Sequence, residues 1–261
     1  MRLNIICICG LAAVILAGSL SSCGGKKEKG EAEVSDSTAI DLQPKAKGDM
    51  ALYGLACDGC TDSVIVILPY EGGNPDTFDI IDAKQNHKVL GRPKIGARIA
   101  VMLNPEDSVE ATMVVNLDDL KGSWCYLAMP KFRDKDKMSK RVRKRMEQSM
   151  PDSARNAMLI AKEMGIDIKR NFSVEPIGMN IISSTTDEQS PLEYPEQKMY
   201  SEWRLYNGNL LLISEMRMPV EGTDSMAISI EADTAEIVML MPDSLVLRFS
   251  DGIKSYYRQK K

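Results

Sequence analysis

The stretch EWRLYNGNLLLI, residues 202–213, decides the fold of this chain because it predicts a β-hairpin. Two apolar runs flank Asn207 and Gly208, and both of these residues tolerate the positive φ that a two-residue hairpin turn requires. We expect one strand over residues 198–206 and its partner over residues 210–218. The hairpin makes an antiparallel β architecture the first hypothesis for this chain.

Further short strands are predicted after the hairpin. Leu245 and Leu247 alternate with Val246 and Arg248, which indicates a strand with one buried and one more solvated face. A meander of six or more strands tends to close as a barrel, because closure leaves no open edge. We therefore predict an antiparallel meander barrel for residues 166–261. The predicted strands cover residues 225–230, 236–241, 244–249 and 253–258.

The region of residues 50–130 also has the pattern of a β structure. Its apolar runs are short, and turn signals such as Gly91-Arg92-Pro93 separate them. Such spacing is typical of a small β-barrel or sandwich, so we expect a separate β-rich N-terminal domain here. The predicted strands cover residues 64–68, 77–81, 95–103, 111–117 and 124–129.

Residues 131–165 differ from both β regions. The run KFRDKDKMSKRVRKR, residues 131–145, carries nine Lys or Arg against two Asp. Pro151 suits the first turn of a second helix, and Gly165 suits a helix end. An apolar stripe at helical spacing, Ala154, Ala157, Met158, Ala161 and Met164, supports that helix. We predict a basic helical hairpin that links the two β domains. Its positive charge is typical of a solvated helix face. It is also typical of a surface patch that contacts anionic lipid or acidic cell-wall polymer.

The first 49 residues indicate export and lipid anchoring. A positive start is followed by an apolar core over residues 5–18, too short to span a bilayer, which predicts a signal peptide over residues 1–22. Leu20-Ser21-Ser22-Cys23 resembles a bacterial lipobox, and this implies that Cys23 becomes the lipidated N-terminus. Residues 23–49 lack aromatic side chains and are predicted to be a flexible tether. We expect a cell-envelope protein held in a membrane, the outer membrane in view of the Gly that follows Cys23.

Composition and motifs argue against two large classes of function. The formal net charge of −4 does not suggest a nucleic-acid binder. The chain has one histidine, His87, and contains neither a G-x-S-x-G nor an H-E-x-x-H motif, nor a glycine-rich phosphate loop. We therefore expect binding or sensing rather than catalysis.

Three stretches resemble a known group of bacterial envelope lipoproteins. The ending PDSLVLRFSDGIKSYYRQK, residues 242–260, resembles the last hairpin of lipocalin-like lipoprotein domains, and residues 202–213 resemble their tryptophan-containing hairpin. GLACDGCTDSVIVIL, residues 54–68, resembles the first strand of NlpE-type lipoproteins, in which Cys-x-x-Cys precedes an alternating strand. The resemblance implies a lipocalin-like barrel and a role in copper tolerance, surface sensing or envelope-stress signalling.

Once the signal peptide is removed, three cysteines remain besides Cys23, and several interpretations stay open. An oxidising compartment favours a disulfide between Cys57 and Cys60, or from one of them to Cys125. A redox role would need a helix after the pair, whereas a strand is predicted there. These three thiols and His87 together provide the four ligands that a tetrahedral zinc site requires. The resemblance implies copper as a cofactor, and weaker sulfur ligands for Cu(I) occur two residues apart in predicted strands, Met216 with Met218 and Met239 with Met241.

The sequence therefore predicts a lipid-anchored, non-catalytic envelope protein that binds or senses. Its expected partners are the membrane, through the anchor, and either an envelope protein or a small apolar ligand. Two alternatives stay open: a copper-handling lipoprotein that uses Cys57 and Cys60, and an assembly or scaffold protein whose barrel is filled by side chains.

Overall fold

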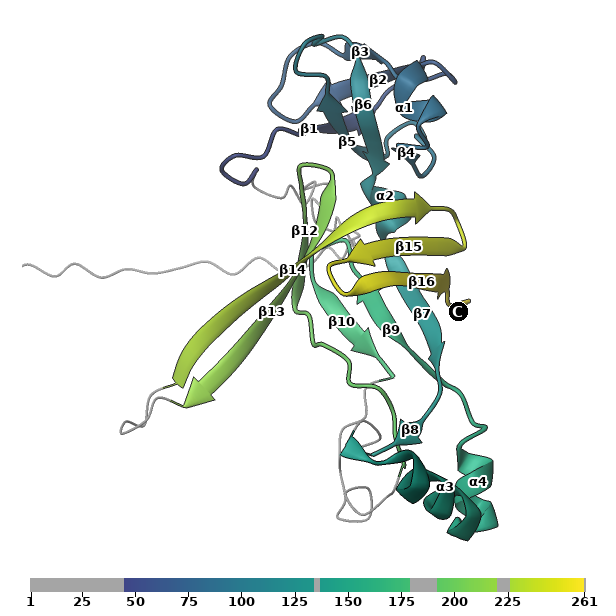
Figure 1. Ribbon diagram of the computed structural model, residues 1–261. Helices are drawn as coiled ribbons and strands as arrows, with labels where there is room; N and C mark the ends of the chain where they lie inside the picture. Colours follow the sequence, from purple (N-terminus) through teal and green to yellow (C-terminus); the bar gives the residue numbers. More distant parts are fainter. Residues whose placement is uncertain (1–44, 134–136, 179–191, 220–225, 261) are drawn as a thin grey trace, which may run out of the picture. The chain divides into compact units, whose positions relative to one another are not determined.

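The computed structural model describes residues 45–133, 137–178, 192–219 and 226–260 (Figure 1). The predicted signal peptide, Cys23 and the tether as far as residue 44 lie outside these residues. The described chain is mainly β, with one six-stranded sheet and one eight-stranded antiparallel sheet that is nearly closed like a barrel. This confirms the predicted fold class.

The first sheet gathers the strands nearest the N-terminus. Its strand order is β3-β2-β1-β5-β6-β4, and every pairing is antiparallel except that of β4 with β6. Alternating residues of its strands, such as Ile65 and Ile67, point into a small core of their own. Its elements are β1 (Leu52–Ala56), β2 (Val64–Pro69), β3 (Asp76–Asp79), helix α1 (Ile81–Gln85), β4 (Val89–Leu90), β5 (Arg98–Leu103) and β6 (Ala111–Asn116).

The second sheet contains the predicted hairpin and its neighbours. Asn207 and Gly208 have φ of 47° and 76°, as the Asn-Gly turn requires. The sheet order is β10-β9-β7-β16-β15-β14-β13-β12. The strands are β7 (Gly122–Ala128), β9 (Lys162–Ile168), β10 (Val174–Ile177), β12 (Glu202–Tyr206), β13 (Asn209–Pro219), β14 (Met226–Leu240), β15 (Ser244–Phe249) and β16 (Gly252–Arg258).

A few main-chain contacts bring the two end strands of this sheet, β10 and β12, together. An isolated antiparallel bridge joins Ser173 to Glu202. The Trp203 amide donates a hydrogen bond to the Phe172 carbonyl oxygen at 2.8 Å, and the Val174 amide donates to the Ser201 carbonyl oxygen at 2.9 Å. The seam is short, which is why the sheet is nearly rather than fully closed.

One strand is longer than predicted. The sequence predicted separate strands over residues 225–230 and 236–241, but β14 is continuous from Met226 to Leu240. Its register with β13 runs unbroken from the pair Met218–Ala227 to the pair Leu210–Ala235. The polar residues between the two apolar runs therefore continue the strand instead of turning the chain.

The predicted basic hairpin contains two helices, but it is shorter than predicted. Helix α3 (Lys140–Ser149) and helix α4 (Asp152–Ala157) form, and Ser139 caps the first by accepting a hydrogen bond from the Val142 amide. The apolar stripe was misread beyond Met158, because Met164 and Gly165 belong to strand β9. No helix among the described residues is long and apolar enough to cross a membrane. The remaining elements are helix α2 (Leu117–Leu120) and a two-stranded pair, β8 (Lys131–Phe132) with β11 (Leu192–Glu193).

Strand β7 does not follow the predicted domain boundary at residue 130. It lies in the sequence region assigned to the N-terminal domain, yet it pairs with β9 and β16 of the second sheet. Helix α2 joins β6 directly to β7, so the chain passes from one sheet to the other before residue 122. Residues 41–261 form one compact unit.

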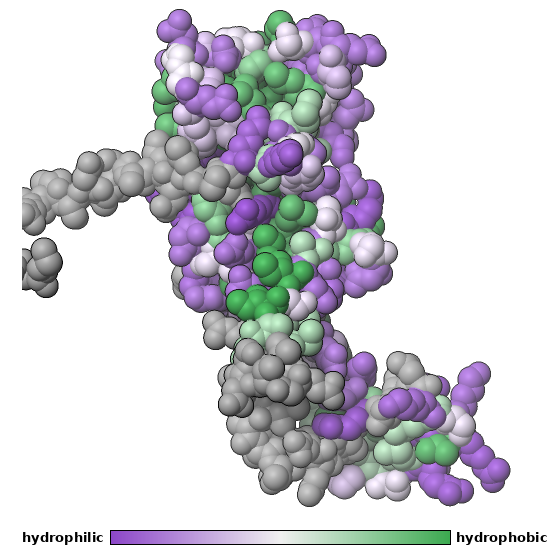
Figure 2. Space-filling model, turned by 90° about the vertical axis from the view of Figure 1, so that its left-hand side faces the viewer, coloured by the Kyte–Doolittle hydropathy of each residue, from purple (hydrophilic) through white to green (hydrophobic). Residues whose placement is uncertain are grey.

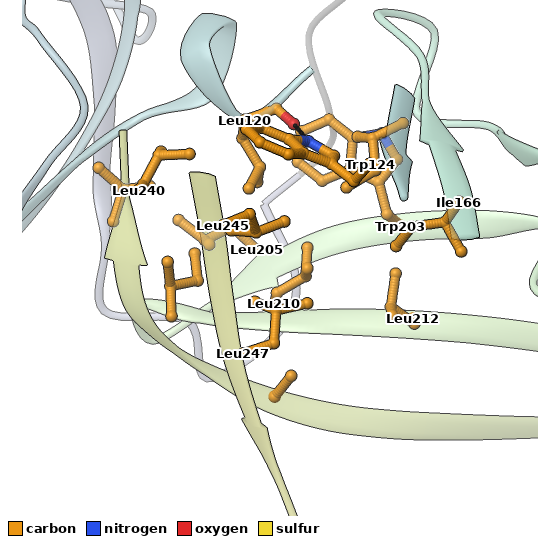
Figure 3. Packing of buried hydrophobic residues seen from close by; sticks show 14 of the residues in the cluster. Leu120, Trp124, Ile166, Trp203, Leu205, Leu210, Leu212, Leu240, Leu245 and Leu247 are labelled. Carbon is orange, nitrogen blue, oxygen red and sulfur yellow. Dashed lines mark hydrogen bonds between the residues drawn. The ribbon is translucent and has the colours of Figure 1, made fainter. Parts of the chain in front are cut away.

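Large side chains fill part of the interior of the second sheet (Figure 3). Trp124 and Trp203 are both fully buried, and each indole nitrogen donates a hydrogen bond to a carbonyl oxygen, of Leu120 at 2.7 Å and of Lys169 at 2.9 Å. Leucines and isoleucines from the surrounding strands pack against them: Leu205, Leu210, Leu212, Leu240, Leu245, Leu247 and Ile166.

Candidate functional site

A cavity of about 640 Å³ opens where the filled part of the second sheet ends. Strands β7, β9, β14 and β16, the end of β15 with the β15–β16 turn, and residues 196–200 supply its walls. The volume falls within the few hundred to a thousand Å³ typical of small-molecule sites, which often lie in the mouths of β-barrels. This cavity is the strongest candidate for a binding site in the described part of the chain.

The inward faces of the strands explain why the core gives way to a cavity. On β14, Asp233 follows Ala235 and Ile237 on the same face, because alternate residues of a strand point the same way. On β16, Lys254 and Tyr256 stand opposite the buried Leu247 and Leu245 of β15 and share their face. The inward face thus changes from packed aliphatic to polar side chains along each strand.

Aromatic side chains form one wall of the cavity. The rings of Tyr126 and Tyr256 meet edge to face, with centroids 5.7 Å apart and planes at 80°. Burial raises the pKa of the Tyr256 phenol, and the neighbouring Tyr126 and Asp251 add to this. Neither hydroxyl makes a hydrogen bond to another group of the described chain. Two phenol groups are therefore left for a bound molecule.

A further unpartnered atom comes from Gln197. Its Nε2 amide group donates a hydrogen bond to the Gly165 carbonyl oxygen on β9, which fixes the orientation of the side chain. Its Oε1 atom is buried and has no hydrogen-bond partner among the described residues. Buried polar atoms are nearly always satisfied, so this oxygen needs a donor from water or from a ligand.

A charged cluster lies at the edge of the cavity. The Asp233 carboxylate accepts hydrogen bonds from the Lys198 ammonium group at 2.7 Å and from the Tyr200 hydroxyl at 2.7 Å. Burial acts to raise the pKa of Asp233, but these hydrogen bonds and the charges of Lys198 and Lys254 outweigh it, so the pKa lies below its ordinary value. Burial and the bond to Asp233 raise the pKa of Tyr200. At neutral pH Asp233 is ionised, and Tyr200 is a neutral donor.

Both ammonium groups of the cavity are paired with carboxylates. The Lys254 ammonium group lies 3.4 Å from an Asp251 carboxylate oxygen and 4.8 Å from the centre of the Phe249 ring. With the exposed Glu196, the lining holds three carboxylates and two ammonium groups, so it offers no surplus of positive charge to an anion. A site with paired ammonium groups, an aromatic wall and spare hydrogen-bonding atoms suits a small amphipathic molecule without negative charge.

The structure also places the three cysteines that the sequence singled out. Cys57, Cys60 and Cys125 are free thiols in the structure, so the predicted disulfide is not formed. The Cys60 sulfur lies 3.3 Å from the Cys57 carbonyl oxygen and 3.5 Å from that of Val66, which directs the thiol to the main chain of the β1–β2 connection. Cys125 is buried on β7, in the other sheet.

The structure does not gather the predicted metal ligands. No group of three or more His, Cys, Asp or Glu that could hold a metal occurs among the described residues. His87 is exposed in the turn after α1. Met216 pairs with Ser229, whereas Met239 lies ten residues further along β14, roughly 33 Å away at the rise of a strand. The other two methionines, Met218 and Met241, are also exposed.

Comparisons of the chain with protein-family models, with curated proteins and with solved structures found no match. The candidate site therefore depends on its own geometry. Sequence reasoning named none of the cavity residues as site residues. Phe249, Ser250, Asp251, Lys254 and Tyr256 belonged to the ending that resembles a lipocalin-like hairpin, whereas Tyr126, Gln197 and Asp233 carry no local motif.

Proposed function

We propose that this chain is a lipid-anchored protein of the cell envelope that binds a small amphipathic molecule in the cavity of a lipocalin-like barrel, without catalysis. One observation carries the proposal: beside its packed core the second sheet leaves a cavity of about 640 Å³, and the lining of this cavity contains polar atoms without a partner among the described residues. The lipobox-like ending of the apolar N-terminal segment supports the anchor, and the resemblance to NlpE-type lipoproteins supports a sensing role.

A blocking substitution tests the binding. Lys254 lines the cavity from the inward face of β16 and is exposed, so Lys254→Trp fills space without disturbing the core. The probe is N-phenyl-1-naphthylamine, a neutral amphipathic fluorophore that brightens in apolar sites. We expect saturable binding to the unchanged chain and its loss in Lys254→Trp. Ile253→Trp, on the same strand but on its outer face, replaces an exposed side chain and should bind as the unchanged chain does. Equal titrations of the unchanged chain and Lys254→Trp would contradict the proposal.

The anchor has its own test. Mass spectrometry of the protein extracted from membranes of an expressing Gram-negative host should give an N-terminal peptide that begins at Cys23 and carries acyl chains. Cys23→Ala should abolish both the cleavage and the acylation. An unmodified chain that begins at another residue would exclude the lipoprotein part of the proposal and leave the cavity untouched.

A second function, as an assembly protein, is favoured by another observation. The part of β13 and β14 beyond their neighbours (residues 214–219 and 226–231, the β13–β14 ribbon) has no strand partner on either outer edge in the described chain. Figure 2 views the molecule from the side toward which this ribbon points in Figure 1, and hydrophobic surface gathers there. The exposed apolar side chains are Met216, Met218, Met226, Ile228 and Ile230.

Open edges and apolar faces suit the addition of a strand from an envelope protein partner. A photo-reactive amino acid at Ile228 should give one discrete protein adduct in cells, and Ile230→Lys should abolish it. If Ile230→Lys leaves the adduct unchanged, the contact is unspecific and the assembly function is excluded.

A further inference from the structure

Helix α3 carries more positive charge than it can neutralise. It has five cations and one carboxylate, Glu147, and none of its residues is buried. None of the five cations forms an ion pair within the described residues. They are Lys140, Arg141, Arg143, Lys144 and Arg145.

The placement of these cations opposes the stability of the helix. Lys140 and Lys144 are four residues apart, as are Arg141 and Arg145, and like charges at this spacing repel. Three cations also occupy the first turn, where the partial positive charge of the helix end disfavours them. The packing of the protein does not explain this arrangement, whereas an anionic surface outside the protein would relieve the repulsion.

A groove beside the helix combines charge with apolar surface. It encloses about 590 Å³, and Lys140, Arg143 and Lys144 line it on one side. Phe132 on β8 and Met158 after α4 supply apolar lining. A phosphate group could meet the cations there while hydrocarbon meets the apolar lining.

The chain exposes large aliphatic side chains next to the groove. Leu159 and Ile160 directly follow Met158, and they are 76% and 60% exposed. In Figure 2 the α3–α4 part, at the lower right, shows hydrophilic purple side chains with green ones among them. An acidic polymer would use the cations alone, but an anionic bilayer offers both phosphate and acyl chains.

We propose that the α3–α4 surface, residues 139–160, docks on an anionic lipid bilayer. Lys and Arg contact the head groups, and Leu159 and Ile160 enter the boundary with the acyl chains. This contact is separate from the cavity and from the anchor, and it would hold the folded part of the chain against a membrane surface in a fixed orientation.

A tryptophan reporter tests the docking in the full chain. Trp124 and Trp203 are both 0% exposed, so a tryptophan introduced by Leu159→Trp is the one that a brominated lipid can quench. We expect quenching and a blue shift in mixed phosphatidylcholine–phosphatidylglycerol vesicles, and neither in phosphatidylcholine alone. The matched control, Ile95→Trp, replaces a side chain that is 74% exposed in the β4–β5 connection and should stay unquenched.

A variant with fewer cations on helix α3 provides the second test of the docking. Arg141→Gln, Lys144→Gln and Arg145→Gln, added to Leu159→Trp, change exposed residues of a helix without buried side chains, so the fold should persist. At roughly 1 kcal/mol for each cation near an anionic surface, the affinity should fall about a hundredfold. Circular dichroism confirms that the helix content is retained. Quenching that is equal without phosphatidylglycerol, equal in the neutralised variant, or equal at Ile95→Trp would overturn the proposal.

Discussion

Tyr126 and Tyr256 stand edge to face, 5.7 Å between ring centres, at the point where the filled interior of the second sheet becomes a cavity. Below them Trp124, two residues from Tyr126 on the same face of β7, is fully buried. Beyond them the inward positions carry Lys254 and Asp233. A single sheet thus contains a packed part that provides stability and an open part that provides a binding site.

Removing the two hydroxyls should affect binding but not folding. Tyr126→Phe and Tyr256→Phe break no hydrogen bond within the described chain, so each should change the free energy of unfolding by less than about 0.5 kcal/mol. Tyr200→Phe removes the bond to Asp233 and should cost about 1.5 kcal/mol. Urea denaturation of the three variants measures this. A cost for Tyr256→Phe equal to that of Tyr200→Phe would show that the Tyr256 hydroxyl is already engaged.

The Asp233 cluster should make stability depend on pH. Because the pKa of Asp233 lies below its ordinary value of 3.8 in the folded protein, the ionised form contributes stability that is present above that value. This contribution is lost as the pH falls through the lower pKa of the folded state. The difference in unfolding free energy between the unchanged chain and Asp233→Asn should stay constant from about pH 7 to about pH 5 and shrink below about pH 4. A difference that grows on acidification would contradict the assignment.

The seam between β10 and β12 should depend on Trp203. Trp203→Phe removes the indole hydrogen bond to Lys169 and leaves a void in the core, so it should destabilise the protein by about 2–4 kcal/mol. Ile230→Ala, at an exposed position of the β13–β14 ribbon, should change stability by less than about 0.5 kcal/mol. Chemical denaturation compares the two variants. Equal effects would mean that the seam adds little to stability.

The thiols should differ in reactivity. Burial raises the pKa of Cys125, and the carboxylates of Glu163 and Asp167 raise it further, so its reactive thiolate is scarce. Cys57 and Cys60 are partly exposed. Alkylation of the folded protein, followed by mass spectrometry, should modify these two and leave Cys125 until the chain unfolds. A mass two hydrogens lower before reduction would indicate a disulfide, contrary to the free thiols of the structure.

The sequence was sufficient for the local elements whose signals are short-ranged. Asn207 and Gly208 placed a hairpin correctly, because the turn needs the positive φ that these two residues tolerate. Most strands were recognisable from apolar runs between turns. The helix prediction failed after Met158, because Met164 begins the alternation Met164, Ile166 and Ile168, which is the buried face of strand β9.

The pairing of distant strands could not be predicted in this way. Strand β7 was placed with the N-terminal strands, but its partner Tyr257 of β16 lies far along the chain from Cys125, and no local pattern records such a pairing. The cavity depends on that pairing, because it brings Tyr126 to Tyr256. The sequence therefore predicted a barrel, but neither which strands close it nor which residues line its open part.

Amide NMR spectroscopy of the isotope-labelled protein, titrated with N-phenyl-1-naphthylamine, tests the central claim most directly. If the probe enters the cavity, resonances of Tyr126, Gly165 and Tyr256 should shift together and saturate at one equivalent. Shifts confined to the β13–β14 ribbon, or no shifts at all, would contradict a ligand site inside the barrel.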